Sequence, residues 1–203
     1  MRKMIRQIFI CSILASLLWG TSLLSDRNKL NEELIRLHVV ANSDSMEDQN
    51  IKMMVRDAVN SSLSRDLEQI CDPDQALEYI QKNLPKIQMI ANQVLAKAGV
   101  APDAVVSVCR EAFDTRSYDT FSLPAGVYHT LRITIGEGLG KNWWCVTFPM
   151  LCQSATSSEF KEAAVEAGFS EVLSDTLTES DGFQIRFYLL DVIGKLENML
   201  YEA

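Results

Sequence analysis

The stretch over residues 124–152 constrains the fold more than any other, because it contains two strand-forming runs separated by a glycine-rich segment. Its sequence is PAGVYHTLRITIGEGLGKNWWCVTFPMLC. Pro124 and Gly126 predict an opening turn, since proline fixes its own φ and glycine accepts positive φ. Apolar and polar residues alternate over 127–135, and a second run rich in β-formers follows over 142–148. The glycine-rich segment between the two runs favours a tight reversal. The sequence therefore predicts a β-hairpin at the centre of the fold.

The glycine-rich segment also suggests a phosphate-binding loop, but its spacing argues against one. A P-loop has four residues between its first glycine and the Gly-Lys pair, which is followed by Ser or Thr. Here three residues separate Gly136 from Gly140, and Asn142 follows Lys141. A dinucleotide site also needs a helix after the glycines, so that its N-terminal N–H groups meet the pyrophosphate. A strand is expected there instead, so the sequence predicts a plain turn and no cofactor.

The N-terminus has the pattern of an export signal. Three cations, Arg2, Lys3 and Arg6, precede an apolar run, which is typical of the basic and hydrophobic regions of a secretion signal. The run from Ile8 to Leu24 is 17 residues, about 25 Å as a helix, which is at the short limit for crossing a membrane. A cleaved signal and a retained anchor both fit this pattern. We therefore expect residues 1–25 to be a signal peptide or membrane anchor.

Composition and charge narrow the remaining functions. The chain of 203 residues has 47% apolar and 23% charged residues, which is typical of a globular protein, and we expect one domain over 26–203. The net charge is −8, and the first 25 residues contribute +3, which leaves −11 for the remainder. So acidic a body argues against nucleic acid as a partner, because phosphates require a basic face. Contact with a membrane is expected only through the N-terminal segment.

Upstream of the hairpin, regular apolar patterns follow recognisable helix starts. Ser45 begins a predicted capping box, and Asp72 with Pro73 predicts a second helix start. Pro85 lies inside the second pattern and predicts a break near Asn83. The expected elements are a short connector at 25–34, a strand at 34–41, a helix from 45 to about 65, a broken helix over 72–98, a strand at 105–113 and a polar loop at 114–122.

Beyond residue 152 the composition becomes more polar. We expect a weakly ordered linker region over 153–182, containing one helix at 159–165, then a strand at 183–187 and a closing helix at 189–200. The order of all these elements predicts an α+β fold. Its sheet is expected to be mainly antiparallel, with helices on one face and the signal or anchor helix in front.

The cysteines lack the spacing of a metal or redox site. No Cys-x-x-Cys occurs, so neither zinc nor thioredoxin-like chemistry is expected, and Asp-x-Asp-x-Asp calcium spacing is absent as well. Export makes disulfides possible. Cys145 and Cys152 flank a bend around Pro149, which allows either a bridge between them or two buried thiols.

The alternative to a binding protein is a cysteine hydrolase. It would use Cys145 or Cys109 with one of the two histidines, His38 or His129. His38 stands alone in a strand, where a packed histidine is the commoner case, and His129 shares a strand face with apolar residues. No Gly-x-Ser-x-Gly or His-Glu-x-x-His motif occurs. We therefore predict no catalytic residues. A third alternative is a membrane-anchored structural component of the cell envelope.

Two long blocks resemble the stage II sporulation protein R family. The first, LIRLHVVANSDSMEDQNIKMMVRDAV, spans 34–59, and the second joins SLPAGVY to GEGLGKNWWCVTFPMLC and ends at residue 152. The resemblance thus covers about residues 34–152. The positions within these blocks that the resemblance marks are His38, Asn42, Asp44, Asp48, Arg56, Asp57, Pro124, Gly126, Trp143, Trp144 and Pro149.

The resemblance implies a role in signalling. Members of this family are made in the forespore and exported into the space that faces the mother cell. There they activate a membrane-embedded aspartic peptidase that matures the sigma factor sigma-E from its precursor. The chemistry implied is that of the peptidase, and this chain would contribute binding energy. The expected contacts are in the hairpin tip and the 114–122 loop, although both also suit ordinary solvated turns. They are Arg116, Gly136, Glu137, Gly138, Gly140, Lys141 and Asn142.

Overall fold

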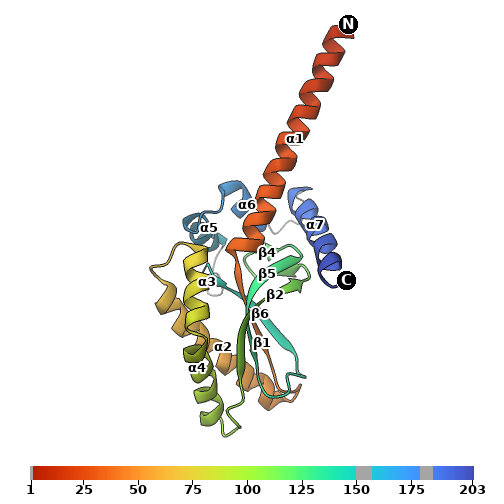
Figure 1. Ribbon diagram of the computed structural model, residues 1–203. Helices are drawn as coiled ribbons and strands as arrows, with labels where there is room; N and C mark the ends of the chain where they lie inside the picture. The colour runs from red at the N-terminus through yellow and green to blue at the C-terminus, as the bar shows by residue number, and fades with distance from the viewer. Residues whose placement is uncertain (1, 150–156, 179–184) are drawn as a thin grey trace.

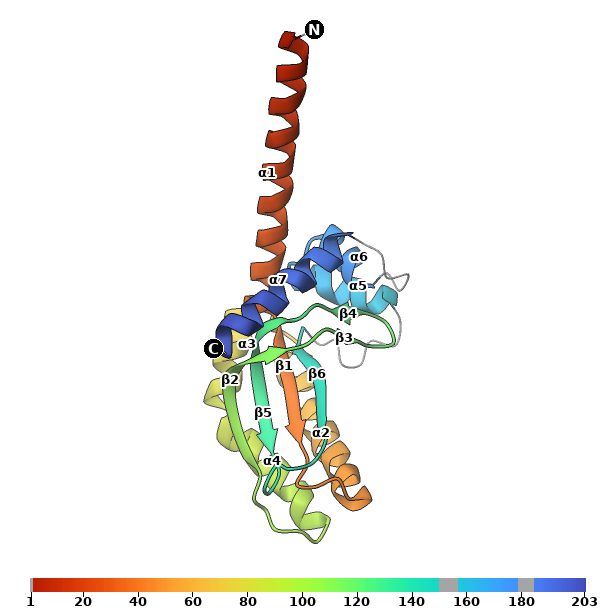
Figure 2. The ribbon, with the colours of Figure 1, turned by 90° about the vertical axis from the view of Figure 1, so that its right-hand side faces the viewer.

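A four-stranded sheet forms the core of the computed structural model, which describes residues 2–149, 157–178 and 185–203. The strand order is β2-β5-β1-β6, with β1 parallel to β5 and the other two pairs antiparallel. Figure 2 shows the four strands side by side in front of the helices behind them. Their bounds are β1 Ile35–Val40, β2 Val105–Phe113, β5 Gly126–Thr134 and β6 Asn142–Phe148. The predicted α+β class with a mainly antiparallel sheet is confirmed.

The predicted hairpin is wrong, because β1 lies between β5 and β6. Leu37 of β1 pairs with Leu131 of β5 on one side and with Cys145 of β6 on the other. The physical reason is in β1 itself, where all six residues are buried. A strand that is buried on both faces and both edges belongs at the centre of a sheet, and it displaces the local pairing that the glycine-rich turn suggested.

Three helices cover one face of the sheet. They are α2 Met46–Leu67, α3 Pro73–Lys82 and α4 Leu84–Lys97. The predicted starts are confirmed, since the side chain of Ser45 accepts a hydrogen bond from the N–H of Asp48 and that of Asp72 caps α3. The predicted break at Asn83 separates α3 from α4. The core under these helices includes Leu37, Val39, Val55, Val59, Ile80, Leu95, Leu131 and Ile133.

A second core lies on the other face, at the end of the sheet near α1. It is built by α5 Ser157–Glu166, α6 Glu171–Thr178, α7 Ile185–Tyr201 and a short ribbon of β3 Arg116–Ser117 with β4 Ser122–Leu123. The expected weakly ordered region over 153–182 thus contains two helices, because Leu173 and Leu177 bury one helical face of α6. The strand expected over 183–187 is also wrong for Ile185–Phe187, which form the first turn of α7. The rest of that expected strand lies outside the described residues.

The N-terminal helix α1 (Arg2–Glu33) has two distinct parts. Its first part is apolar and exposed and extends away from the body (Figure 1), and the helix is long and apolar enough to cross a membrane. Its last part belongs to the body, since Leu23 and Leu30 are buried and two ion pairs, Asp26 with Arg186 and Arg27 with Glu197, attach it to α7. The boundary expected at residue 25 therefore falls inside one continuous helix.

Candidate functional site

Residues from the two sequence blocks meet at the end of the sheet opposite α1. The segment 136–141, which links β5 to β6, packs against the turn between β1 and α2. The side-chain oxygen of Asn42 accepts a hydrogen bond from the N–H of Glu137 at 3.1 Å, and Asp44 accepts one from the N–H of Lys141 at 2.7 Å. Asp48 accepts from both Asn42 and Ser43, and these hydrogen bonds lower the pKa of its carboxyl. We call this cluster the glycine junction.

The backbone of the glycine junction leaves no room for a phosphate. The N–H groups of residues 138, 139 and 140 donate to the carbonyls of Ile135, Asn42 and Ala41, at 2.9 to 3.1 Å. Together with the two bonds above, every N–H from 137 to 141 has a protein acceptor. A phosphate cradle needs several of these groups free. The segment is therefore a turn, as the spacing of its glycines predicts. Its hydrogen bonds hold it against the residues that follow β1.

The side chains of Glu137, Leu139 and Lys141 in this turn remain exposed, as does that of Asn142, the first residue of β6. They are available to a partner, while Gly136, Gly138 and Gly140 have backbone roles in the turn. Contact between this turn and a partner stays a prediction.

The other group of sequence-predicted residues lies on the face of the sheet that α2, α3 and α4 do not cover. We call it the open face, although α7 and the β3–β4 ribbon cross its end near α1 (Figure 2). Trp144 of β6 is the centre of this group. His38 stacks on its indole with ring centroids 5.6 Å apart, and the Cζ atom of Arg116 lies 3.9 Å from its ring centroid. The three planar groups come from β1, β6 and the ribbon. They join two positions of the sequence blocks to the polar loop at 114–122.

His38 is held by a carboxylate of the edge strand β2, which β5 separates from β1. Its Nδ1 lies 2.8 Å from Oε2 of Glu111, and the other oxygen of Glu111 accepts from Arg132 at 2.9 Å. Burial alone would raise the pKa of Glu111, but the hydrogen bonds and charges of His38 and Arg132 outweigh it and hold that pKa below its usual range. The Nε2 atom of His38 is buried and has no hydrogen-bond partner among the described residues.

Arg36 and Glu111 are the polar residues of this face that sequence reasoning missed. Arg36 is fully buried, its guanidinium lies 3.8 Å from the ring centroid of Phe113, and it donates to the hydroxyl of Tyr118 at 2.9 Å. The available signal was a charged residue two positions before His38, on the same face of an otherwise apolar strand. Because an arginine in such a strand needs partners, it pointed to a polar cluster on one face.

The remaining marked positions have packing roles. On the helix-covered face, Arg56 of α2 lies over Trp143 at 4.5 Å and pairs with Asp57. At the start of β5, the hydroxyl of Tyr128 donates to the carbonyl of Pro124 at 2.7 Å. A side chain at Gly126 would collide with the guanidinium of Arg27 in α1. Gly126 is the first residue of β5 and is not among the glycines with positive φ, so the turn expected here does not use it. Its lack of a side chain instead lets α1 pack closely against the start of β5.

The arrangement does not support a cysteine hydrolase. Cys145 faces the helices, on the side of the sheet opposite His38, and it is disulfide-bonded. Cys109 contacts Glu111 at 3.6 Å, and burial together with the charge of that carboxylate raises the pKa of its thiol to about 11. His129 lies 3.2 Å from Glu32, a residue of α1. Among the described residues, no cysteine and histidine form a hydrogen-bonded pair, and no three His, Cys, Asp or Glu side chains gather as for a metal ion.

The partner of Cys145 was predicted to be Cys152. That residue lies outside the described residues, so this pairing stays a prediction. Cys11, Cys71 and Cys109 are free thiols.

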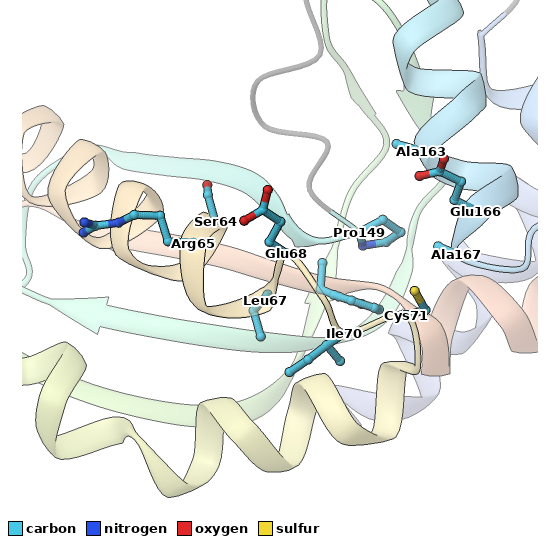
Figure 3. A pocket seen from close by; sticks show the side chains of 11 residues that line it. Ser64, Arg65, Leu67, Glu68, Ile70, Cys71, Pro149, Ala163, Glu166 and Ala167 are labelled. Carbon is cyan, nitrogen blue, oxygen red and sulfur yellow. The ribbon is translucent and has the colours of Figure 1, made fainter.

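A cavity of about 400 Å³ opens between the end of α2, the turn into α3, the end of β6 and α5 (Figure 3). Pro149 and Cys71 line it, and Glu68 and Glu166 come from its two sides. Its described lining contains no histidine, and its polar side chains, Arg65 among them, form no ion pair or hydrogen bond with one another. The cavity therefore offers volume but no chemistry that the sequence blocks would explain.

Comparisons with known proteins agree with the two blocks. The family model described as stage II sporulation protein R matches residues 31–158, which include the glycine junction and most of the open face. Stage II sporulation protein R of Bacillus subtilis (strain 168) is 33% identical over 184 residues, covering 81% of this chain and 82% of that relative. No solved structure matches. The chain belongs to the stage II sporulation protein R family and has a role in sporulation.

Proposed function

We propose that the protein is an exported sporulation signal that acts by binding. In this proposal it activates a membrane-embedded aspartic peptidase of the mother cell, which then processes the sigma-E precursor. The observation that carries the proposal is α1, whose three N-terminal cations, Arg2, Lys3 and Arg6, precede an apolar helix that continues into the body. Cations stay on the cytoplasmic side of a membrane, so the body lies on the opposite side. For a forespore protein, that side faces the mother cell.

The described side chains support binding in place of catalysis. The open face holds His38, Glu111 and the thiol of Cys109. Burial raises the pKa of that thiol, and the thiol makes no contact with His38. A protein without its own chemistry can still switch an enzyme on, by binding the active state of that enzyme more tightly than the inactive state. No observation favours the cysteine hydrolase.

Complementation in sporulating cells tests the proposal. Cells that lack the gene should leave the sigma-E precursor unprocessed in an immunoblot, and the full chain should restore processing. A chain without Ile8–Leu18 should not restore it, because the body would stay in the forespore. Cys109→Ser is the matched control that should complement fully. Normal processing in the deletion strain would refute the signalling role, and complementation by the shortened chain would refute export.

A further inference from the structure

Arg36 of β1 is a buried cation that has no acidic partner among the described residues. Its side chain is fully buried, and it takes part in none of the ion pairs of the described structure. Its Nη2 atom donates to the hydroxyl of Tyr118 at 2.9 Å, whereas Nε and Nη1 are buried and have no hydrogen-bond partner. A guanidinium has five N–H donors, so most of the binding capacity of Arg36 is unused.

In the described part of the chain, the open face offers no carboxylate to balance this charge. Both oxygens of Glu111 are used, one by His38 at 2.8 Å and the other by Arg132 at 2.9 Å. Asp114 and Asp119, in the 114–122 loop, are exposed and form no ion pair with the buried guanidinium. A water molecule can accept a hydrogen bond there, but a neutral molecule leaves a buried charge unbalanced.

A second arginine of the open face has the same deficit. Arg116 of β3 takes part in no ion pair among the described residues, and its Nε is buried without a hydrogen-bond partner. It lies over Trp144, two residues before the Tyr118 that contacts Arg36. Both arginines therefore lie where the β3–β4 ribbon meets the sheet, a place that we call the ribbon seam. The ribbon seam carries unbalanced positive charge, although the net charge of the protein is −8.

The surroundings of Arg36 favour a flat ligand with one negative charge. The Cζ atom of Arg36 lies 3.8 Å from the ring centroid of Phe113 and 5.2 Å from that of Tyr128, so aromatic rings fill the space beside the guanidinium. The N–H groups remain, and a planar carboxylate binds such groups through two parallel hydrogen bonds. Because the setting is buried and largely apolar, the attraction between the two charges is stronger than in water. The ribbon seam is thus suited to a carboxylate.

The ribbon decides which kind of molecule brings that carboxylate. It covers the guanidinium of Arg36 through Tyr118, and each of its two strands has only two residues. A carboxylate that reaches Arg36 has to displace part of this cover. A free anion offers only its own charge to offset that displacement, whereas a protein segment adds contacts with the surrounding surface. The cover therefore favours a carboxylate that belongs to a protein.

We propose that Arg36 and Arg116 bind a carboxylate side chain, Asp or Glu, of a partner protein at the ribbon seam. The bound carboxylate balances the charge that the fold leaves unpaired. This inference rests on the proposed function, which makes the partner the membrane-embedded peptidase. It adds the chemistry of the recognised group, an acidic residue on a segment of the peptidase that lies in the space between the two membranes.

Replacing Arg36 with Met in the full chain separates this role from a structural one. Arg36→Met should lower processing of the sigma-E precursor by roughly tenfold or more, because a desolvated charge pair loses one partner. The melting temperature of the detergent-solubilised protein should stay equal or rise, since an apolar side chain in place of a buried unbalanced charge is neutral or stabilising. A clearly lower melting temperature would show that the fold already satisfies Arg36, and it would overturn the inference.

Arg56→Met is the matched control. Arg56 also lies over an indole, that of Trp143 at 4.5 Å, but it pairs with Asp57 and belongs to the helix-covered face. This variant should process the precursor normally, and its melting temperature should not rise, because the lost cation had an acidic partner. Normal processing by Arg36→Met, in cells where deletion of the gene blocks it, would overturn this inference alone. An equal loss of processing by both variants would also overturn it.

Arg36→Lys identifies the bound group directly, because it keeps a cation at this position and supplies an amine. A carbodiimide couples an amine to a carboxylate in contact with it, forming an amide with loss of water. In membranes of sporulating cells, we expect this variant to form an adduct with an Asp or Glu of the peptidase, located by mass spectrometry, and Arg56→Lys to form none. An adduct with a second copy of the chain, or no adduct from a variant that still signals, would overturn the inference. Normal processing in the deletion strain would instead refute the proposed function itself.

Discussion

The guanidinium of Arg116 lies 3.9 Å from the ring centroid of Trp144, on an indole that His38 also stacks against. The contact ties the 114–122 loop to the sheet. Arg116 was expected to be a solvated charge at the rim of a binding surface, but its Nε is buried and has no described partner. The loop is therefore part of the packed open face, and a change at Arg116 alters stability as well as surface charge.

Replacing Arg116 with Met keeps the aliphatic stem and removes the cation. The free energy of unfolding should fall by about 0.5–1 kcal/mol, the usual size of a partly exposed cation–π contact. Urea denaturation of the purified protein measures it. Lys141→Met is the control, because the Lys141 side chain is exposed and stacks on no ring in the described structure. An equal loss at both positions would show that the contact with Trp144 contributes nothing.

Charge reversal at Lys141 separates signalling from folding more cleanly. Lys141→Glu should weaken precursor processing with little change in the melting temperature, since exposed charges act mainly on encounter and specificity. The carbonyl of Lys141, which accepts from Lys52 at 2.9 Å, is unaffected by the substitution. Normal processing by this variant would place the contact surface away from the glycine junction.

The loss of folding stability in acid should depend on Glu111. Its pKa is lower in the folded protein than its ordinary value of 4.5, so its contribution to stability is present above about pH 4.5 and is lost as the pH falls through the lower folded value. Glu111→Gln should lower the free energy of unfolding at pH 7 by about 1–3 kcal/mol, because His38 and Arg132 lose a charged acceptor. Urea denaturation at pH 7 and pH 3 should show the difference shrinking in acid. A difference that is the same at both values would contradict the linkage.

Two glycines with positive φ allow the cost of backbone strain to be measured apart from the cost of a steric collision. Gly99 has φ +77° and open space around it, whereas Gly136 has φ +55° and a side chain there would collide with the amide of Asn42. Gly99→Ala should therefore cost roughly 1–2 kcal/mol, the penalty of the left-handed region alone. Gly136→Ala should cost more, because Asn42 must also move and lose its bond to Glu137. Equal losses in denaturant titrations would mean that the glycine junction tolerates the added atom.

Thiol labelling tests the absence of an activated cysteine. In a Cys11→Ser background, maleimide at pH 7.5 should label exposed Cys71 and leave Cys109 unmodified. With its pKa at about 11, Cys109 has a thiolate fraction on the order of 10⁻³ or less at that pH. Cys71→Ser should abolish the fast labelling. Fast modification of Cys109 would revive the cysteine hydrolase as an alternative.

Local signals were sufficient to predict much of this fold. The caps at Ser45 and Asp72, the break before Pro85 and the two apolar strand patterns depend on neighbouring residues, and all are present. The pairing of strands depends on residues far apart in sequence, and there the local turn was misleading. β1 is buried on both faces although Arg36 and His38 alternate with its apolar residues, so its pattern resembled that of a half-exposed strand.

The candidate site was predictable only in part. His38 and Trp144 lie in the sequence blocks, and the structure brings them together. The contribution of Glu111 depends on β2 pairing with β5 and β5 with β1, and no spacing in the sequence encodes that order.

The central place of β1 determines when this protein can fold. Leu37 pairs with Leu131, 94 residues further along the chain, and with Cys145 beyond it. In the proposed export, α1 leads the chain through the membrane, so β1 crosses before its two neighbouring strands, which arrive much later. The sheet therefore cannot be complete until residue 148 has crossed, because β1 has no neighbouring strand before β5, and its second neighbour, β6, ends at residue 148. In the proposed export, the sheet is therefore completed only after nearly three quarters of the chain has passed, so the end of export and the completion of the sheet coincide.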